Sequence, residues 1–275
     1  MKNDKITFIG GGNMAASLIS GLIADGYAQS AITVSDPDSD KLSQLAAHYG
    51  VHTVSNNEQA IQQADIVVLA VKPQVLETVA RDMAKAIQQS TPLVISIAAG
   101  VTVGVLNEWL GGGLALVRSM PNTPAMIQSG ATGLYAGPTV SEAQRNQAES
   151  ILRAAGVTCW VTEESQIDAV TAVSGSGPAY FFLIMEAIEE AAKEMGLDDD
   201  TVRLFTLQTA LGAARMAMES SDSPAVLRQK VTSPGGTTEC ALNILEQGGL
   251  RSLFRDALQG AQKRSKELSD LLGHQ

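Results

Sequence analysis

The sequence predicts an α/β domain built on a mostly parallel sheet, followed by an all-helical domain. Up to about Glu163, short apolar runs alternate with helical stretches, which is typical of parallel strands joined by helical crossovers. From Gln166 onward the apolar residues recur every three or four positions, and β-branched runs become rare. We therefore expect a sheet domain over residues 1–163 and a helical domain over residues 164–275, a division that suits a chain of 275 residues.

Short apolar runs predict the individual strands. The runs cover residues 6–9, 32–34, 66–71, 93–97, 114–117 and 158–161, and one more short strand is expected between His48 and His52. Helices are predicted from their apolar period and from the residues at their ends, such as Pro178 at a start and Gly196 at a stop. They cover residues 14–24, 179–195, 202–218 and 239–247.

The composition excludes several classes of protein. The net charge of −10 and the lack of a Lys/Arg cluster disfavour a nucleic-acid surface. Cys159 and Cys240 are isolated, so we expect neither a disulfide framework nor a metal site. No apolar run approaches the roughly 20 residues of a membrane helix. Because residues 1–5 lead directly into a strand, we expect no signal peptide and a cytoplasmic protein without membrane contact.

A glycine-rich turn follows the first predicted strand and opens the first predicted helix. The pattern G-x-G-x-x-A is met by Gly10-Gly11-Gly12-Asn13-Met14-Ala15. In this context glycines allow a tight turn and let backbone N–H groups approach a pyrophosphate, which the positive end of the helix dipole also attracts. The turn predicts a dinucleotide-binding, Rossmann-like domain, and the alternative is a glycine turn without a ligand.

The second predicted strand ends at Ser35 and Asp36. Asp36 lies 24 positions after the last glycine of the pattern, near the usual offset of about 20 for the acid that binds the adenosine ribose. Asp36, Asp38 and Asp40 would repel a 2′-phosphate unless Lys41 or another base intervenes, so this loop favours NADH over NADPH. Asp38 and Asp40 have a simpler alternative role, which is to cap and start the next helix.

Two further segments lie at the carboxyl ends of strands, where open α/β sheets bind their ligands. They are Ala70-Val71-Lys72-Pro73 and Ala98-Ala99-Gly100. Lys72 is the one cation placed there; alternatively, it is a surface lysine that begins a helix. Residues 118–124 contain Pro121 and Pro124, and this rigid loop, with Asn122, is expected to wall the nicotinamide side of the cleft.

The helical half contains a second candidate site at residues 233–239. The Gly235-Gly236 turn, with the hydroxyls of Ser233, Thr237 and Thr238, runs into a predicted helix. Such a turn binds an anion through backbone N–H groups and the helix dipole. Alternatively, Thr237 or Thr238 is an N-cap.

The predicted helix 179–195 has a broader apolar face than a small helical domain covers by itself. Its apolar residues include Phe181, Phe182, Ile184, Met185 and Ile188. A helical dimer interface is the economical explanation, and an internal core is the alternative. Gly175 and Gly177, just before this helix, allow the approach of a backbone or ligand, or equally dense helix packing.

None of the histidines, His48, His52 and His274, lies at a candidate site. Hydride addition to a ketone needs a proton donor for the developing alkoxide, usually His or Lys. A cyclic imine that is protonated beforehand needs less help, and a hydroxyl such as that of Thr238 is enough to orient its ring nitrogen. The sequence therefore favours an imine as the substrate.

Together these segments resemble the pyrroline-5-carboxylate reductase family nearly end to end. The matching segments are residues 8–15, 70–74, 120–124, 167–180 and 231–238. The resemblance implies hydride transfer from NAD(P)H to 1-pyrroline-5-carboxylate, giving L-proline in the last step of proline biosynthesis. It also implies that residues 233–238 hold the substrate carboxylate and that Thr238 hydrogen-bonds the ring nitrogen.

The resemblance further implies where the cofactor binds. Its contacts fall on residues 10–14, the end of the second strand, Asn57, residues 70–72, and Ala98 with Ala99. Family members pair their helical domains into dimers and often build larger rings. Many use NADPH through a serine or a basic residue at the end of the second strand. The matching position here is Asp36, so both NADPH and NADH stay open.

Two rival functions fit the sequence less well. A β-hydroxyacid dehydrogenase shares the two-domain plan but needs a catalytic lysine early in the first long helix of its second domain. Here no lysine follows Gly177 until Lys193. A dinucleotide sensor that only dimerises would explain residues 10–15 but would leave residues 233–238 without a purpose.

Overall fold

The computed structural model describes residues 4–273, so His274 and residues 1–3, on which the expected absence of a signal peptide partly rests, lie outside the described residues. Its contacts divide the chain into two compact units. Of the described residues, the sheet unit comprises 4–176 and 261–273, and the helical unit comprises 177–260. Residues 164–176 and the end of the last helix thus pack with the sheet. The division at residue 163 stays a prediction.

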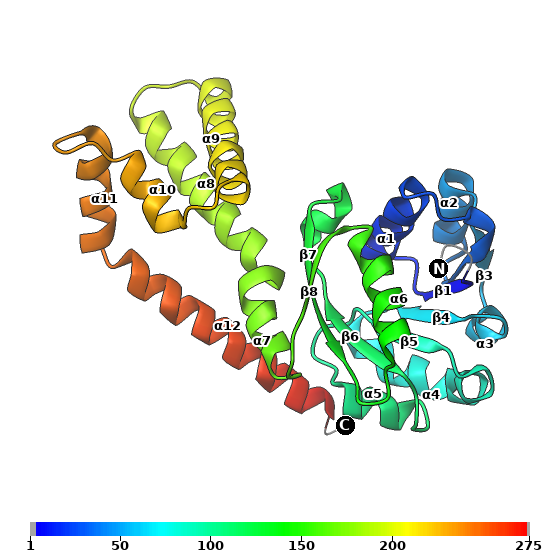
Figure 1. Ribbon diagram of the computed structural model, residues 1–275. Helices are drawn as coiled ribbons and strands as arrows, with labels where there is room; N and C mark the ends of the chain where they lie inside the picture. Colours follow the sequence, from blue (N-terminus) through cyan, green and yellow to red (C-terminus); the bar gives the residue numbers. More distant parts are fainter. Residues whose placement is uncertain (1–3, 274–275) are drawn as a thin grey trace. The chain divides into compact units, whose positions relative to one another are not determined.

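Within the described residues, the sheet unit has eight strands in the order β3-β2-β1-β4-β5-β6-β7-β8 (Figure 1). The strands are β1 (Ile6–Ile9), β2 (Ile32–Ser35), β3 (His52–Val54), β4 (Ile66–Leu69), β5 (Leu93–Ser96), β6 (Leu116–Met120), β7 (Gly130–Ala136) and β8 (Gly156–Trp160). Neighbouring strands are parallel except β6 and β7, which are antiparallel. The predicted mostly parallel sheet is confirmed.

The strand β7 was not predicted from the sequence because glycine and alanine, which fill much of this strand, have low strand propensity. Small residues are needed here for packing. A Cβ on Gly130 would lie 2.8 Å from the Ala155 carbonyl oxygen, and one on Gly133 would lie 2.6 Å from Val170 Cγ1. The neighbours of β7, and not its own composition, therefore make it a strand.

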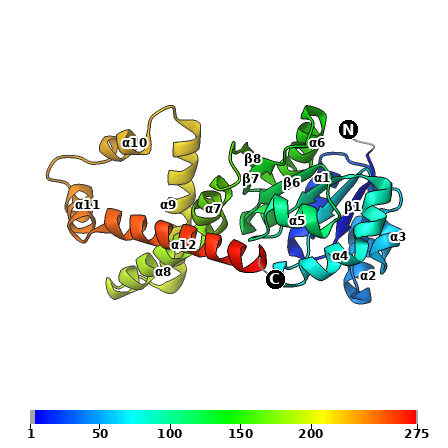
Figure 2. The same cartoon turned by 90° about the horizontal axis from the view of Figure 1, so that it is seen from below.

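Helices cover both faces of this sheet (Figures 1 and 2). Ile6 and Phe8 of β1 belong to one core and Ile9 to the other, as expected for alternating side chains of a strand buried on both faces. The first core includes residues of α1 (Asn13–Ala24), α2 (Ser39–Tyr49) and α6 (Glu142–Arg153). The second includes residues of α3 (Asn57–Ile61), α4 (Pro73–Ser90) and α5 (Val103–Trp109). The short helices η1 (Gln29–Ala31) and η2 (Thr123–Ile127) lie in connections.

The chain around Gly175 forms a π-helical turn, η3 (Thr171–Gly175), which follows α7 (Gln166–Val170). A Cβ on Gly175 would lie 2.5 Å from Met120 Cε. The glycine thus allows this turn to pack closely on the end of β6, which supports the dense-packing alternative.

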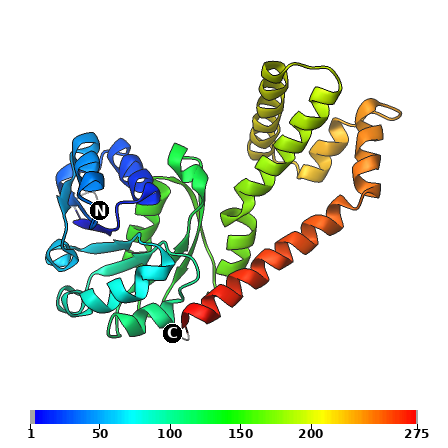
Figure 3. The same cartoon turned by 180° about the vertical axis from the view of Figure 1, so that it is seen from behind.

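The helical unit contains the helices α8 (Gly177–Glu194), α9 (Asp199–Glu219), α10 (Pro224–Lys230), α11 (Thr237–Gln247) and the first part of α12 (Leu250–Gly273) (Figure 3). Asp198 caps α9 by accepting a hydrogen bond from the Thr201 N–H at 3.0 Å, and Ser223 caps α10. The predicted helices 179–195, 202–218 and 239–247 are confirmed, with their ends shifted by at most three residues.

The predicted apolar face of α8 is exposed in a single chain. Phe181 and Phe182 are each 64% exposed, and Ile188 is 50% exposed. The internal-core alternative is therefore wrong within one chain. Contrary to the expectation from the sequence, the helical segment 166–194 is long and apolar enough, by length and composition alone, to cross a membrane. Mean hydropathy over a window detects this segment, whereas a search for an unbroken apolar run does not.

Candidate functional site

The glycine turn after β1 is held against both neighbouring strands. Gly10 has a φ of +101°, and its N–H donates to the Ser35 carbonyl at 2.7 Å. A Cβ at this position would lie 2.7 Å from the Ala70 carbonyl oxygen. Gly10 therefore closes the tight turn and brings the ends of β2 and β4 to it.

Gly12 occupies a different environment in the same turn. It is the N-cap of α1, with φ −76° and ψ −179°, and nothing lies within 4 Å of a Cβ built on it. No side chain caps α1, and its first turn has no acidic residue. A groove of about 600 Å³ is lined by the glycine turn and by α2 residues, including Lys41. Open N–H groups at a helix start fit a pyrophosphate.

Asp36 supports the backbone of this turn. Its side chain is buried, and its Oδ2 accepts the Gly11 N–H at 2.8 Å while its Oδ1 accepts the Asp38 N–H at 2.9 Å. Lys41 Nζ lies 3.6 Å from Oδ1 and 3.7 Å from Asp38 Oδ2. Lys41, the base that the sequence offers near a 2′-phosphate, therefore lies beside Asp36 and Asp38. The contact of Asp36 with a ribose stays a prediction.

Asp38 is the N-cap of α2, as the simpler alternative held. It accepts hydrogen bonds from the backbone N–H groups of Asp40 and Lys41 at 3.0 and 3.1 Å. The Lys41 N–H, more than any other group, lowers the pKa of the Asp38 carboxyl. Asp40 lies in the first turn of α2, where its charge suits the helix dipole.

The end of β2 also contacts the start of α3. Ser35 Oγ donates to Asn57 Oδ1 at 2.7 Å, and Ser35 is buried. The structure therefore brings together two residues that the family resemblance named separately.

The segment after β4 begins α4, with Lys72 as N-cap and Pro73 in the first turn. This confirms that Lys72 begins a helix. Its side chain is exposed and has no ion pair among residues 4–273. Lys72 therefore remains available to an anionic ligand, and Val71 contacts the position of a Gly10 Cβ at 3.0 Å.

Ala98, Ala99 and Asn122 lie on two further loops of this unit. Ala98 is buried, with its N–H 3.3 Å from Ser96 Oγ, whereas Ala99 is exposed. Asn122 uses both ends of its amide within the fold: Nδ2 donates to Ser174 and Oδ1 accepts the Ala131 N–H at 2.9 Å. Asn122 thus fixes its loop, and its contact with a cofactor stays a prediction.

The turn before α11 opens its helix without a side-chain cap. Gly235 has a φ of +69°, the Gly236 N–H donates to the Ser233 carbonyl at 3.0 Å, and Gly236 is the N-cap. The N-cap alternative for Thr237 and Thr238 is therefore wrong, and both occupy the first turn. The Glu239 carboxylate accepts the Gly235 N–H at 2.7 Å.

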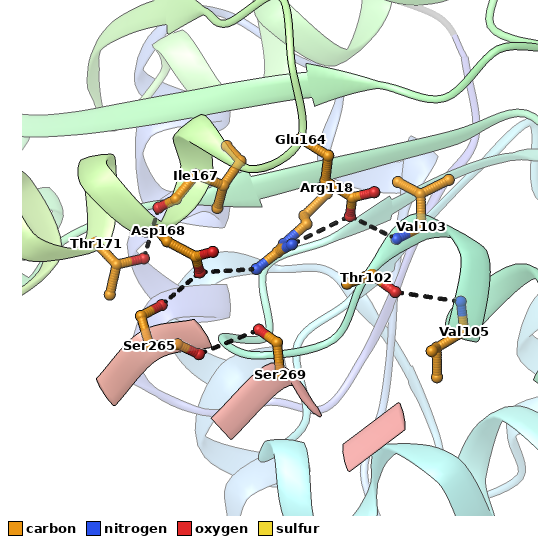
Figure 4. A network of polar contacts seen from close by, with 10 residues as sticks. All are labelled: Thr102, Val103, Val105, Arg118, Glu164, Ile167, Asp168, Thr171, Ser265 and Ser269. Carbon is orange, nitrogen blue, oxygen red and sulfur yellow. Dashed lines mark hydrogen bonds and ion pairs between the residues drawn. The ribbon is translucent and has the colours of Figure 1, made fainter. Parts of the chain in front are cut away.

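A buried charge network centred on Arg118 was not predicted from the sequence. This side chain is only 4% exposed, and its guanidinium lies 3.1 Å from Glu164 and 3.9 Å from Asp168 (Figure 4). A cation inside the apolar run of β6 was the available signal, because a buried cation needs charged partners. Among residues 4–273 no cluster of three His, Cys, Asp or Glu side chains could hold a metal ion.

The chain matches known families over most of its length. Residues 164–268 match the family described as pyrroline-5-carboxylate reductase dimerisation, and residues 5–100 match the family described as NADP oxidoreductase coenzyme F420-dependent. The pyrroline-5-carboxylate reductase of Pseudomonas aeruginosa is 48% identical, over 99% of this chain and 100% of its own length.

Solved structures are similar as well. A pyrroline-5-carboxylate reductase from Coxiella burnetii has a TM-score of 0.94 at 52% identity, covering 97% of this chain and 99% of that chain. The pyrroline carboxylate reductase of Plasmodium falciparum, solved with NADP bound, has a TM-score of 0.86 at 28% identity, covering 98% of this chain and 99% of that chain. With relatives this similar over their full length, the chain belongs to the pyrroline-5-carboxylate reductase family.

Proposed function

We propose that this chain reduces 1-pyrroline-5-carboxylate to L-proline with a hydride from NAD(P)H. The observation that carries the proposal is that one chain offers two glycine turns, at Gly12 and Gly236, each opening a helix without a side-chain cap. One turn suits the pyrophosphate of a dinucleotide and the other suits the carboxylate of a small substrate. Among residues 4–273, His48 lines the groove beside Gly12, on the cofactor side, and neither His48 nor His52 is part of the turn before α11, as suits an imine substrate.

The sheet unit would hold the dinucleotide. The N–H groups at the start of α1 bind the pyrophosphate, with Asn13 and Met14 in the first turn. Ser35, Asp36 and Asn57 flank the adenosine ribose. Residues 70–73, 98–99 and 122 line the rest of the cofactor's path. When bound, NAD(P)H supplies the hydride.

The turn before α11 would hold the substrate carboxylate. The N–H groups of Thr237 and Thr238 lie in the first turn of α11, where backbone donors have no intrahelical partner. The Gly235 N–H already donates to the Glu239 carboxylate, which supports a carboxylate as the kind of group that binds to the N–H donors of this turn. Ser233 and Thr237 add hydroxyl donors around the substrate.

Thr238 would orient the ring nitrogen of the substrate, because its hydroxyl oxygen accepts a hydrogen bond from the protonated nitrogen. Hydride adds to the imine carbon, and the electron pair of the C=N π bond moves to the nitrogen, which already carries its proton. The product is a secondary amine, so no side chain needs to donate a proton in this step.

We further propose that the protein is a cytoplasmic homodimer that assembles into a larger ring without membrane contact. The match of residues 164–268 to a dimerisation family supports self-association through this part of the chain. Glu186, Glu189 and Glu190 interrupt the apolar surface of α8, which disfavours lipid around this helix. Light scattering tests this, and a monomer at micromolar concentration would contradict it.

The decisive experiment mixes the purified protein with 1-pyrroline-5-carboxylate and follows the absorbance of NADH and NADPH in parallel. We expect oxidation of at least one cofactor and formation of proline. Cofactor binding without oxidation would favour the dinucleotide sensor. Oxidation of NAD(P)H with the keto form of a β-hydroxyacid, but not with the imine, would favour the β-hydroxyacid dehydrogenase. If the absorbance of neither NADH nor NADPH falls, the proposed activity is wrong.

A further inference from the structure

Arg118 joins two carboxylates that come from the segment after β8. Its Nη1 donates to Glu164 Oε1 at 3.1 Å, and its Nη2 lies 3.9 Å from Asp168 Oδ1 (Figure 4). Arg118 is 4% exposed, while the side chains of Glu164 and Asp168 are 24% and 13% exposed. Without the guanidinium, two carboxylates would face each other with little water between them, which is unfavourable.

Glu164 holds one end of the loop that follows β5. Its Oε1 also accepts the backbone N–H of Val103, the first residue of α5, at 2.7 Å. Thr102 caps the same helix by accepting the Val105 N–H at 3.3 Å. Glu164 therefore connects Arg118 to the backbone of Val103, the residue at which the loop of residues 98–102 ends.

Asp168 holds the helix on which the middle of that loop rests. Its Oδ1 accepts the Ser265 hydroxyl at 2.7 Å, which fastens α12 to the sheet unit. Further along α12, Leu272 Cδ1 and Leu268 Cβ lie 3.2 and 3.8 Å from the position of a Cβ on Gly100. Gly100 has a φ of +79°, so the loop bends where α12 supports it.

We propose that Arg118 is a positioning residue for the cofactor. Through Glu164 it fixes the end of the 98–103 loop, and through Asp168 and Ser265 it fixes the helix that supports the middle of the loop. The loop then presents Ala98 and Ala99 in one shape to the dinucleotide. This inference rests on the proposed function, in which these two residues contact NAD(P)H.

Ser265 and Ser269 provide a matched pair of variants to test the network. Both are buried serines on α12, but only Ser265 bonds Asp168, whereas the Ser269 hydroxyl bonds the Ser265 carbonyl within the same helix at 3.2 Å. In the ligand-free protein, Ser265→Ala should speed amide hydrogen exchange in residues 98–103 about tenfold or more, as expected for loss of one hydrogen bond to a charged group. Ser269→Ala should leave that exchange at the wild-type rate.

The second measurement is cofactor binding, by calorimetric titration with NADPH and with NADH. Ser265→Ala should raise the Kd and the KM of the cofactor about three- to tenfold while kcat at saturating cofactor changes little, because the loop can still be ordered by the bound cofactor. Arg118→Lys should shift exchange and Kd in the same direction. If that variant does not fold, the serine pair still decides.

Equal exchange and equal Kd in the two serine variants would overturn the positioning role. So would faster exchange spread evenly over the sheet unit, since that is general destabilisation. If the wild-type protein binds neither cofactor, the proposed function fails at once, while the exchange of residues 98–103 still shows whether the network holds the loop.

Discussion

Gly10 and Gly12 allow the two roles of the glycine turn to be separated by the same substitution. Gly10→Ala places a methyl group 2.7 Å from the Ala70 carbonyl oxygen, at a φ of +101°. Gly12→Ala places a methyl group where nothing lies within 4 Å, at an ordinary φ of −76°. The first change should therefore damage the fold, and the second should damage only what approaches the turn from outside.

The expected magnitudes differ accordingly. For Gly10→Ala, the strained backbone costs about 1–3 kcal/mol and the overlap with β4 about 1–3 kcal/mol, so unfolding should become easier by about 2–6 kcal/mol. Domains of this size have about 5–15 kcal/mol of stability in total. Gly12→Ala loses only part of an N-cap preference, about 1 kcal/mol or less. Its methyl group should nevertheless weaken NADPH binding about tenfold or more, which is about 1.4 kcal/mol.

Urea unfolding followed by tryptophan fluorescence measures the first quantity, since Trp109 is buried in the core of the sheet unit. Titration of NADPH measures the second. Equal unfolding midpoints in the two variants would show that the turn tolerates a Cβ at Gly10. Wild-type NADPH affinity in Gly12→Ala would refute the claim that a pyrophosphate lies against this backbone.

Three further outcomes are expected. Asp36→Ser should shift the ratio of kcat/KM values toward NADPH, because a carboxylate that repels a 2′-phosphate is lost; an unchanged ratio would mean that Asp36 serves only the backbone of the turn. Thr238→Ala should cost about 1–3 kcal/mol of transition-state stabilisation and Thr238→Ser much less, and wild-type turnover in the alanine variant would remove its role. Burial, followed by the charges of Asp4 and Asp65, raises the pKa of Tyr27 from 10.0 to about 12. Because the folded state favours the neutral phenol, the free energy of unfolding of the wild type should fall as the pH rises from about 10 to 12. Tyr27→Phe lacks this phenol and should show a smaller fall. An equal fall in the two proteins, measured by denaturant unfolding, would contradict this.

Much of the site in the sheet unit was predictable because its determinants are local. A glycine needed at a positive φ, a helix that starts after it and an acid at the end of β2 are each visible in a few consecutive residues. Their convergence follows from the rule that the carboxyl ends of parallel strands share one edge of the sheet. The exposed apolar face of α8 was predictable for the same reason, since helical periodicity is a short-range property.

The partners of these side chains were not predictable in the same way. Asp36 is predicted to contact a ribose, and its oxygens also accept the N–H groups of Gly11 and Asp38. Asn122 is predicted to contact the cofactor, and its amide also joins its loop to Ser174 and Ala131. A polar side chain at the carboxyl edge of the sheet can hydrogen-bond the backbone, the ligand or both. Only the interatomic distances in the structure show which backbone groups it bonds.

The α/β class, the two glycine turns that each open a helix and the family resemblance follow from the sequence alone, because these depend on residue type and on spacing along the chain. Only the tertiary structure decided that β7 is a strand, that α12 returns to the sheet unit, and that Arg118 lies between two carboxylates. The physical reason is the distance along the chain between the groups involved. Ser265 and Asp168 are 97 positions apart, and no local pattern marks a hydrogen bond between them.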